Sequence, residues 1–334
     1  MIAKNKKPLK KPDQVEQALK AWRKNRFRIM VCIDGSDASY EGLHFAAKLG
    51  HVPECDIVLT YVRQVDQGMR TGGLQARVAR ENMLEWGIEL PGIEYLQKGV
   101  EILQQDGVKR SDKWNIEASH RDVWGDPLGD NKIEYRHEDG RSIVLKLKTS
   151  PDEAGGILDQ YELGPYNLII MGEPGRWRGG LRSNLNAGVA QKVAMLAPCS
   201  VLIARKAGIE NTSGHLIATS GTHHSLDAVR RHGVLAKYLD EPVTLLSISD
   251  GTLDKHKAKD SLAIAGAMLE GIGTKVNDLI VEEGDPTKTI LGIGNDYSMI
   301  GVADTGKSWL KRFFKGSVSF NVMGQATTSV MNVR

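Results

Sequence analysis

The stretch from Gly301 to Val318 combines the residue types that bind phosphate groups. Gly306 and Gly316 lack a Cβ, so the backbone around them can approach a ligand closely. N–H groups at the start of the helix expected after Gly316 carry partial positive charge. Ser317 adds a hydroxyl at the same place, and the loop supplies four cations, Lys307, Lys311, Arg312 and Lys315. The stretch therefore predicts a phosphate site, although the same residues would also suit a surface turn.

A second, imperfect copy of this pattern lies near the middle of the chain. An apolar strand is predicted at 168–171, followed by a loop rich in glycine and arginine at 172–182. A helix start at 187–193 comes next, and a further apolar strand at 199–205 matches the one predicted at 329–334. Self-similarity on this scale indicates that the chain is duplicated.

The string Gly301-Val-Ala-Asp-Thr-Gly-Lys-Ser308 also matches the P-loop pattern. In that interpretation, Lys307 would reach the β- and γ-phosphates and Ser308 would bind Mg²⁺. Its position argues against a P-loop, because no acidic strand end follows it to serve the metal. Both interpretations predict bound phosphate.

Histidine and cysteine give no comparable signal. His223 and His224 are adjacent, but no Cys, Asp or Glu stands at ligand spacing from them, so no metal site is expected. Cys32, Cys55 and Cys199 lie in or beside apolar runs and are expected to be buried, reduced thiols. No Ser/His/Asp or Cys/His arrangement can be assembled, so no catalytic residue is predicted.

Length and charge narrow the class of protein. The chain has 334 residues, enough for two domains that each bury a core. Its 44 basic and 41 acidic side chains leave a net charge of +3, so nucleic acid is not an expected partner. The sequence shows no signal peptide and no apolar run long enough to span a membrane, and a cytoplasmic location is expected.

The elements that would position these residues are predicted from apolar patterning. Almost continuous apolar runs at 28–33 and 56–62 indicate buried strands of a parallel sheet, joined by a helix. Trp114–Ser119 is predicted as the third strand, with Gly125-Asp-Pro127 starting the next helix. Alternation on either side of Asp139-Gly140 predicts a hairpin with a type I′ turn, interpreted as an insertion.

The second half repeats this order with fewer additional segments, and there Gly284-Asp-Pro286 is expected to begin a helix. The predicted organisation is a basic tail and short helix at 1–26, a first domain at 27–206 with insertions near 66–112 and 128–150, a linker at 207–214 and a second domain at 215–334.

These landmarks, in the same order twice, resemble the universal stress protein family in its tandem two-domain form. The resemblance covers about residues 27–65, 113–127, 151–205 and 215–334. It implies an α/β fold in which each domain is a five-stranded, mostly parallel, Rossmann-like sheet flanked by helices. It also implies that the last strands, 199–205 and 328–334, pair with each other, and an exposed sheet edge needs such a partner.

ATP-binding members of this family carry Gly-x-x-Gly, nine residues, and then Gly-Ser or Gly-Thr. In the second half, Ala303 replaces the first Gly, and nine residues separate Gly306 from Gly316. Ser220 stands where the family has an Asp for the adenosine, and Ile248 where an apolar residue would pack on adenine. The resemblance thus implies a site made of Ala303, Thr305, Gly306, Lys307, Gly316, Ser317, Val318, Ser220 and Ile248.

The first half differs from the family in the opposite way. Asp34 and Val62 are in place for the adenosine, but the loop is longer by two residues and Ala187-Gly188 replaces Gly-Ser. The weaker site implied here consists of Asp34, Val62, Gly172, Gly175, Arg176 and Gly188. We therefore expect the second domain to bind phosphate better, and the first to be degenerate or altered in ligand.

The sequence thus predicts a cytoplasmic stress-response regulator that binds an adenine nucleotide, expected to be ATP with or without Mg²⁺, chiefly in the second domain. Fast turnover is not expected, although slow hydrolysis of ATP is compatible with the pattern. The alternative is a nucleotide-independent scaffold with degenerate sites. Expected partners are a second tandem chain, in a homodimer, or a protein bound through the insertions of the first domain.

Overall fold

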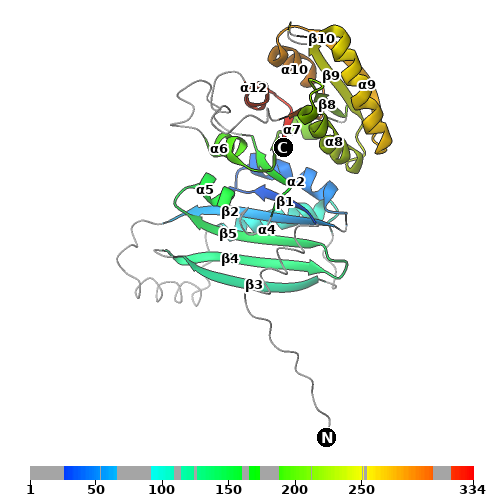
Figure 1. The fold of residues 1–334 in the computed structure, drawn as a ribbon. Helices are drawn as coiled ribbons and strands as arrows, with labels where there is room; N and C mark the ends of the chain where they lie inside the picture. Colours follow the sequence, from blue (N-terminus) through cyan, green and yellow to red (C-terminus); the bar gives the residue numbers. More distant parts are fainter. Residues whose placement is uncertain are drawn as a thin grey trace.

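The structure, a computed structural model, describes residues 26–52, 54–65, 92–108, 114–123, 126–159, 165–173, 188–211, 213–249, 251, 254–303 and 317–334. Within these ranges one sheet of twelve strands runs through both halves of the chain, in the order β10-β9-β8-β11-β12-β7-β6-β1-β2-β5-β4-β3 (Figure 1). Among the described helices, none is both long enough and apolar enough to cross a bilayer.

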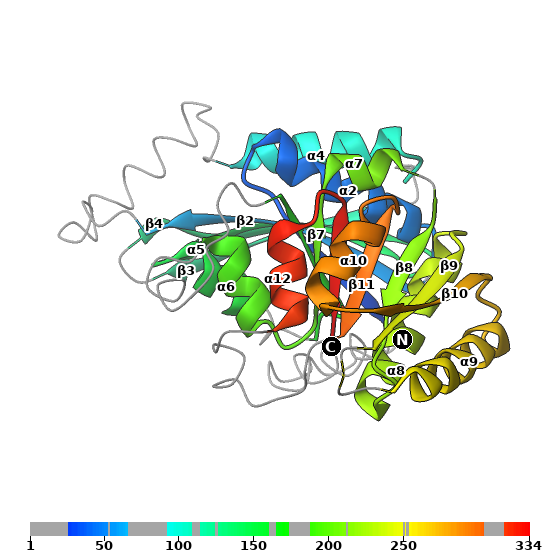
Figure 2. The ribbon, with the colours of Figure 1, turned by 90° about the horizontal axis from the view of Figure 1, so that it is seen from above.

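The first half is built on four parallel strands: β1 (Phe27–Cys32), β2 (Cys55–Gln64), β6 (Leu168–Gly172) and β7 (Ser200–Ala204). Apolar residues alternate to both faces of these strands, so both faces must be covered. Figure 2 shows α2 (Asp37–Leu49) and α4 (Ile93–Gln105) on one face, and α5 (Glu153–Asp159) and α6 (Val189–Leu196) on the other. Two apolar clusters result, one under each pair of helices.

The third strand of this half is β5 (Ser142–Ser150), which pairs in parallel with β2 from Asp56↔Ser142 to Gln64↔Ser150. A strand at 114–119 is confirmed, but its predicted place as the third strand of the parallel sheet was wrong. That segment belongs to β3 (Trp114–Val123), which pairs antiparallel with β4 (Asp126–His137) beyond β5. The neighbour of β2 is covered on both faces. Residues 143–147 of β5 are buried and apolar except for Lys146, so they suit that position better than the exposed, polar sequence of β3.

Two related predictions also need correction. Residues 142–150 belong to the central sheet, so the inserted strands are β3 and β4, and Asp126 and Pro127 begin β4 instead of a helix. The hairpin around Gly140 is confirmed, but its turn is not type I′. Gly140 donates to the carbonyl of His137, His137 donates to that of Arg141, and only Gly140 in this loop has a positive φ, of 90°. This is the three-residue loop with a left-handed glycine, whereas type I′ needs positive φ at both central residues.

The second half contains β8 (His215–Ala218), β9 (Val243–Ser249), β10 (Val276–Glu283), β11 (Met299–Ala303) and β12 (Ser329–Val333), all parallel to their neighbours within this half. Its helices are α8 (His223–Tyr238), α9 (Lys255–Gly271), α10 (Pro286–Gly294) and α12 (Val318–Gln325). As predicted, Pro286 starts a helix, and the preceding Asp285 accepts a hydrogen bond from the amide of Lys288.

The two halves meet where β12 pairs antiparallel with β7, with Val330 opposite Ile203. This confirms the predicted pairing of the last strands. Arg205, only 3% exposed, lies between β7 and the short α7 (Lys206–Glu210). Its guanidinium donates to the carbonyls of Thr328 and Met323 at 3.0 and 2.6 Å and to Glu173 at 3.3 Å. One buried cation therefore ties the first half to the end of the second.

Candidate functional site

A cavity of about 430 Å³ opens at the carboxyl ends of the strands of the first half. It lies where the strand order reverses, because the chain runs from β1 to β2 on one side and β6 pairs with β1 on the other. Open α/β sheets bind ligands at such points. Its walls come from the loop after β1, the ends of β2 and β6, and the starts of α5 and α6.

Asp34 lies at the mouth of this cavity, on the loop between β1 and α2. Its Oδ1 accepts hydrogen bonds from the amide and the hydroxyl of Ser36, at 2.9 and 2.6 Å. Partial burial by itself would raise the pKa of the Asp34 carboxyl, but the Ser36 hydrogen bonds outweigh it and lower the pKa. Asp34 is therefore an oriented, ionised acceptor at neutral pH.

Gly172, at the end of β6, lines the same cavity. The structure gives it a packing role that the sequence did not reveal. A Cβ at this position would lie 2.2 Å from the carbonyl oxygen of Ala38, in the first turn of α2. The glycine thus lets α2 approach β6, and this approach holds the loop that carries Asp34.

The opposite wall is the start of α6. Gly188 is its N-cap and provides no side-chain hydrogen bond, and Gly188, Val189 and Ala190 all line the cavity. N–H groups of a first helical turn carry partial positive charge, so this wall favours a negatively charged group. Val62 and Ile157 add apolar surface. The remaining implied residues of this half, Gly175 and Arg176, lie outside the described residues.

Sequence reasoning missed several residues of the cavity. Thr60 and Ser36 flank Asp34, while Glu153 and Glu173 bring carboxylates to the walls. Glu153 accepts from the Gln64 side chain at 3.1 Å, and Glu173 pairs with Arg205. Correct placement of β5 would have pointed to Glu153, because α5 directly follows the third strand of the sheet.

The second half repeats the loop geometry around Asp34 with different chemistry. The amides of Ile33 and Thr219 donate to equivalent positions, the carbonyls of Thr60 and Leu246. Gly35 and Gly221, which follow, both have positive φ, 89° and 72°. Ser220 therefore stands in the place of Asp34, and Ile248 in that of Val62, as the sequence predicted.

Ser220 contributes a hydroxyl where the first half has a carboxylate. Its Oγ is 3.3 Å from the hydroxyls of both Thr222 and Ser225, and Thr222 caps the start of α8. A Cβ on Gly221 would lie 1.9 Å from Oγ of Ser261, so α9 closely approaches this loop. The described part of this half offers no ionised acceptor at the Asp34 position.

Ser317 is the N-cap of α12, directly before Val318, but its capping bond is long, with the amide of Phe320 at 3.5 Å. Its hydroxyl also lies 2.9 Å from that of Ser319. Ala303 is the last residue of β11. Thr305, Gly306, Lys307 and Gly316 lie outside the described residues, so the phosphate loop of the second half stays a prediction.

The P-loop interpretation finds no support in its first residue. Gly301 lies inside β11, paired with Met331 on one side and Ile217 on the other. A Cβ there would lie 2.3 Å from Nδ1 of His232, which is fully buried. Packing against α8 explains this glycine, and the strand continues for two residues beyond it.

Comparison with known proteins agrees with this architecture. The family model for the universal stress protein family matches the chain twice, over residues 25–205 and 215–334. No curated protein sequence matches the chain.

Solved structures share the fold at low identity. A universal stress protein from Archaeoglobus fulgidus DSM 4304 is 16% identical with a TM-score of 0.58, and the match covers 94% of this chain and 97% of that one. A protein from Pseudomonas aeruginosa UCBPP-PA14, given the same family name, is 14% identical with a TM-score of 0.52, over 96% of this chain and 94% of that one. A universal stress protein from Archaeoglobus fulgidus in complex with dAMP is 20% identical with a TM-score of 0.30, over 36% of this chain and 97% of that one.

Proposed function

The chain belongs to the universal stress protein family, and we propose that it is a cytoplasmic stress-response regulator that binds an adenine nucleotide, ATP. The observation that carries this proposal is the cavity of about 430 Å³ with the ionised Asp34 at its mouth and an uncapped helix start opposite. These two walls suit the two ends of a nucleotide.

The adenosine end fits the side of the cavity formed by β1 and β2. The Asp34 carboxylate accepts hydrogen bonds, so it can bind a ribose hydroxyl, which donates. Val62 and Ile157 provide apolar surface for a planar base. A phosphate would then meet the first-turn amides of α6, which are positive at that end.

Two carboxylates, Glu153 and Glu173, would repel a bare triphosphate. Carboxylate oxygens are the ligands that Mg²⁺ prefers, and Mg²⁺ is usually held by one or two of them together with phosphates. We therefore propose that ATP binds with Mg²⁺. We also propose that the bound state acts by changing the protein surface and not by fast hydrolysis.

For the second domain we keep the proposal of a phosphate site at residues 303–318, built on the glycines and cations of that stretch. Ser220 offers a neutral hydroxyl for the adenosine there, which makes a weaker acceptor than a carboxylate. The two domains should therefore differ in affinity.

Equilibrium binding of labelled ATP tests the proposal and separates the two domains. Asp34→Asn should weaken binding in the first domain roughly tenfold to a hundredfold, because a hydrogen bond to a charged acceptor is lost. Asp37→Asn is the matched control: it removes a carboxylate three residues further on, which is fully exposed and lies outside the cavity. Gly316→Ala/Ser317→Ala reports on the second domain in the same way.

Absence of ATP binding to the wild type would refute the nucleotide proposal. The remaining candidate would then be a nucleotide-independent scaffold. That function is favoured by one observation, the β3–β4 extension, in which side chains of β3 are exposed on both faces of the sheet.

A further inference from the structure

The last strand of the sheet, β3, has one edge without a strand neighbour among the described residues. Its side chains from Asn115 to Ser119 are exposed, and so is Arg121; Ile116 is 57% exposed. These residues alternate between the two faces of the sheet, so neither face of the strand is covered there. A long strand that is open along its edge and on both faces readily accepts another strand.

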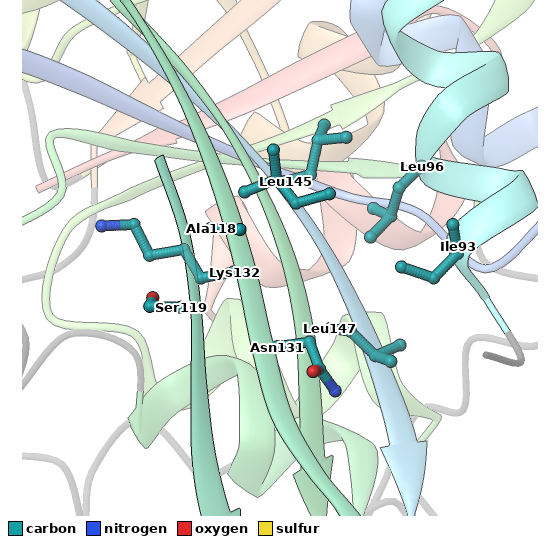
Figure 3. Close-up of a pocket in the computed structure, with 9 residues that line it drawn as sticks. Ile93, Leu96, Ala118, Ser119, Asn131, Lys132, Leu145 and Leu147 are labelled. Carbon is teal, nitrogen blue, oxygen red and sulfur yellow. The ribbon is translucent and has the colours of Figure 1, made fainter. Parts of the chain in front are cut away.

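Among the described helices on this side of the sheet, α4 is the one nearest the groove beside β3. Helix α4 packs on β2 and β5, and an apolar groove of about 320 Å³ separates it from β4 and β3. Figure 3 shows Ile93 and Leu96 of α4 on one side of this groove, with Ala118 and Ser119 of β3 on the other. Because β3 and β4 extend the sheet beyond β5, where α4 packs, the face of β3 next to the groove is exposed.

The charges on β3 indicate what pairs with this edge. Glu117 and Arg121 lie two positions on either side of Ser119 and point to the same face. No ion pair of either side chain with another described residue is found, although Glu117 adds to the effect by which Glu134 raises the pKa of Arg136. Their opposite residues on β4, Glu134 and Asp130, are already neutralised by Arg136 and Lys132 and by Lys148, respectively.

We propose that β3 pairs antiparallel with β3 of a second copy of this chain, about a twofold axis through Ser119, which joins the two sheets into one. In this register Glu117 of each copy lies opposite Arg121 of the other, so two ion pairs form. Opposite charges at directly opposed positions stabilise an antiparallel pair, and like charges destabilise it. A parallel, in-register pair would oppose Glu117 to its own copy.

The strand at the other end of the sheet, β10, provides a contrast. It is also an edge strand with exposed side chains, but its charged residues are all acidic: Asp278, Glu282 and Glu283. An antiparallel pair of two β10 strands would bring carboxylates together with no cation on the strand to offset them. The charges of β10 thus disfavour pairing of two β10 strands. The charges of β3 favour pairing of two β3 strands in one register.

Sedimentation or light scattering of the full chain tests this proposal. We expect the wild type to be a dimer, and Glu117→Arg or Arg121→Glu to raise the dimer dissociation constant at least about tenfold, because each places like charges opposite each other twice. The double variant Glu117→Arg/Arg121→Glu should restore the dimer, since it exchanges the two signs. Circular dichroism checks that these exposed substitutions leave the fold intact.

Disulfide formation tests the register. Residues directly opposite in an antiparallel pair have Cα atoms roughly 4.5–5.5 Å apart, within the range of a disulfide. Ser119→Cys should therefore link two chains on mild oxidation, whereas Asn115→Cys, an equally exposed position on the same strand, lies about 26 Å from its copy and should not. Cys55 and Cys199 are buried and Cys32 is half-buried, which limits background.

A wild type that stays monomeric at all concentrations would overturn the proposal, even if an unrelated extended peptide bound to β3. So would a dimer that withstands Glu117→Arg and fails to form the Ser119→Cys link, because its interface would lie elsewhere. ATP binding plays no part in either measurement, so this inference stands or falls independently of the nucleotide proposal.

Discussion

Gly172→Ala offers a direct test of how the cavity is held together. The added methyl group would lie 2.2 Å from the carbonyl oxygen of Ala38 and 2.7 Å from the amide nitrogen of Ser39, closer than the 3.0 Å below which real Cβ atoms essentially never approach. Both atoms belong to the backbone of α2 and cannot rotate away. The helix and the end of β6 must therefore separate. Overpacking of a close contact costs about 1–3 kcal/mol, and a backbone clash belongs at the upper end, so we expect a loss of about 3 kcal/mol in the free energy of unfolding.

Chemical denaturation followed by circular dichroism measures this loss, and Gly292→Ala is its matched control. Gly292 lies inside α10, and nothing is within 4 Å of a Cβ built there. Because alanine favours the helix, this control should be neutral or stabilise the protein by up to about 1 kcal/mol. If Gly172→Ala left the free energy of unfolding unchanged but abolished ATP binding, the glycine would serve the ligand, and the packing argument would be refuted.

Three further predictions concern charges. Arg205→Lys should lower the free energy of unfolding by about 2–3 kcal/mol in a denaturant titration, because a single ammonium cannot reproduce the separate hydrogen bonds to Thr328 and Met323. The free energy of unfolding should decrease as the pH is lowered below about 6.5. Burial holds the pKa of His232 well below 6.5. Below that pH the unfolded chain therefore binds a proton at His232 that the folded protein does not bind. A second loss, on the order of 3 kcal/mol and absent from Glu241→Gln, should follow between pH 4.5 and 2. Burial raises the pKa of Glu241, but His215, whose Nε2 lies 3.2 Å from the carboxylate, and the hydrogen bond from Ser298 outweigh it and lower the pKa to about 2. The factor by which Asp34→Asn weakens ATP binding should stay constant from neutral pH down to about pH 5, since the pKa of Asp34 is lowered and the phosphates of ATP titrate in both measurements alike; a factor that already shrinks near pH 7 would exclude Asp34 as the ionised acceptor.

The sequence predicted the duplicated α/β architecture because its strongest signals are local. Buried parallel strands such as β1 are apolar on both faces, so their identity does not depend on their neighbours. The third strand of the first half was missed because β5 carries Lys146 and Lys148 in alternation with leucine, the pattern of a half-exposed hairpin strand. In the structure Lys146 is only 9% exposed. Burial of a lysine depends on tertiary contacts that local patterning does not encode.

Two glycines of the predicted phosphate motifs illustrate a related limit. Gly172 and Gly301 both belonged to motifs interpreted as phosphate-binding, and each has a packing partner far away in the sequence, Ala38 and His232. A glycine in the sequence indicates that something approaches the backbone closely, but it does not indicate whether this is a ligand or another helix or strand. Asp34 was easier to interpret, because a carboxylate at the end of a parallel strand lies at the edge where such sheets bind ligands.

The two domains place different chemistry at equivalent positions, and this difference bears on how they would share a ligand. The first has the ionised Asp34 on one wall and, at Gly188, an N-cap without a side chain, so this residue leaves the first-turn amides of α6 open to an anion. In the second, the hydroxyl of Ser317 already accepts from the first turn of α12, although at 3.5 Å that bond is weak and an anion could displace it. A nucleotide would thus meet its stronger adenosine contact in the first domain, while the predicted phosphate contacts of residues 304–316 belong to the second. Two sites of this kind cannot bind equally, so an ATP titration should resolve two classes of affinity, and Asp34→Asn should shift only one of them.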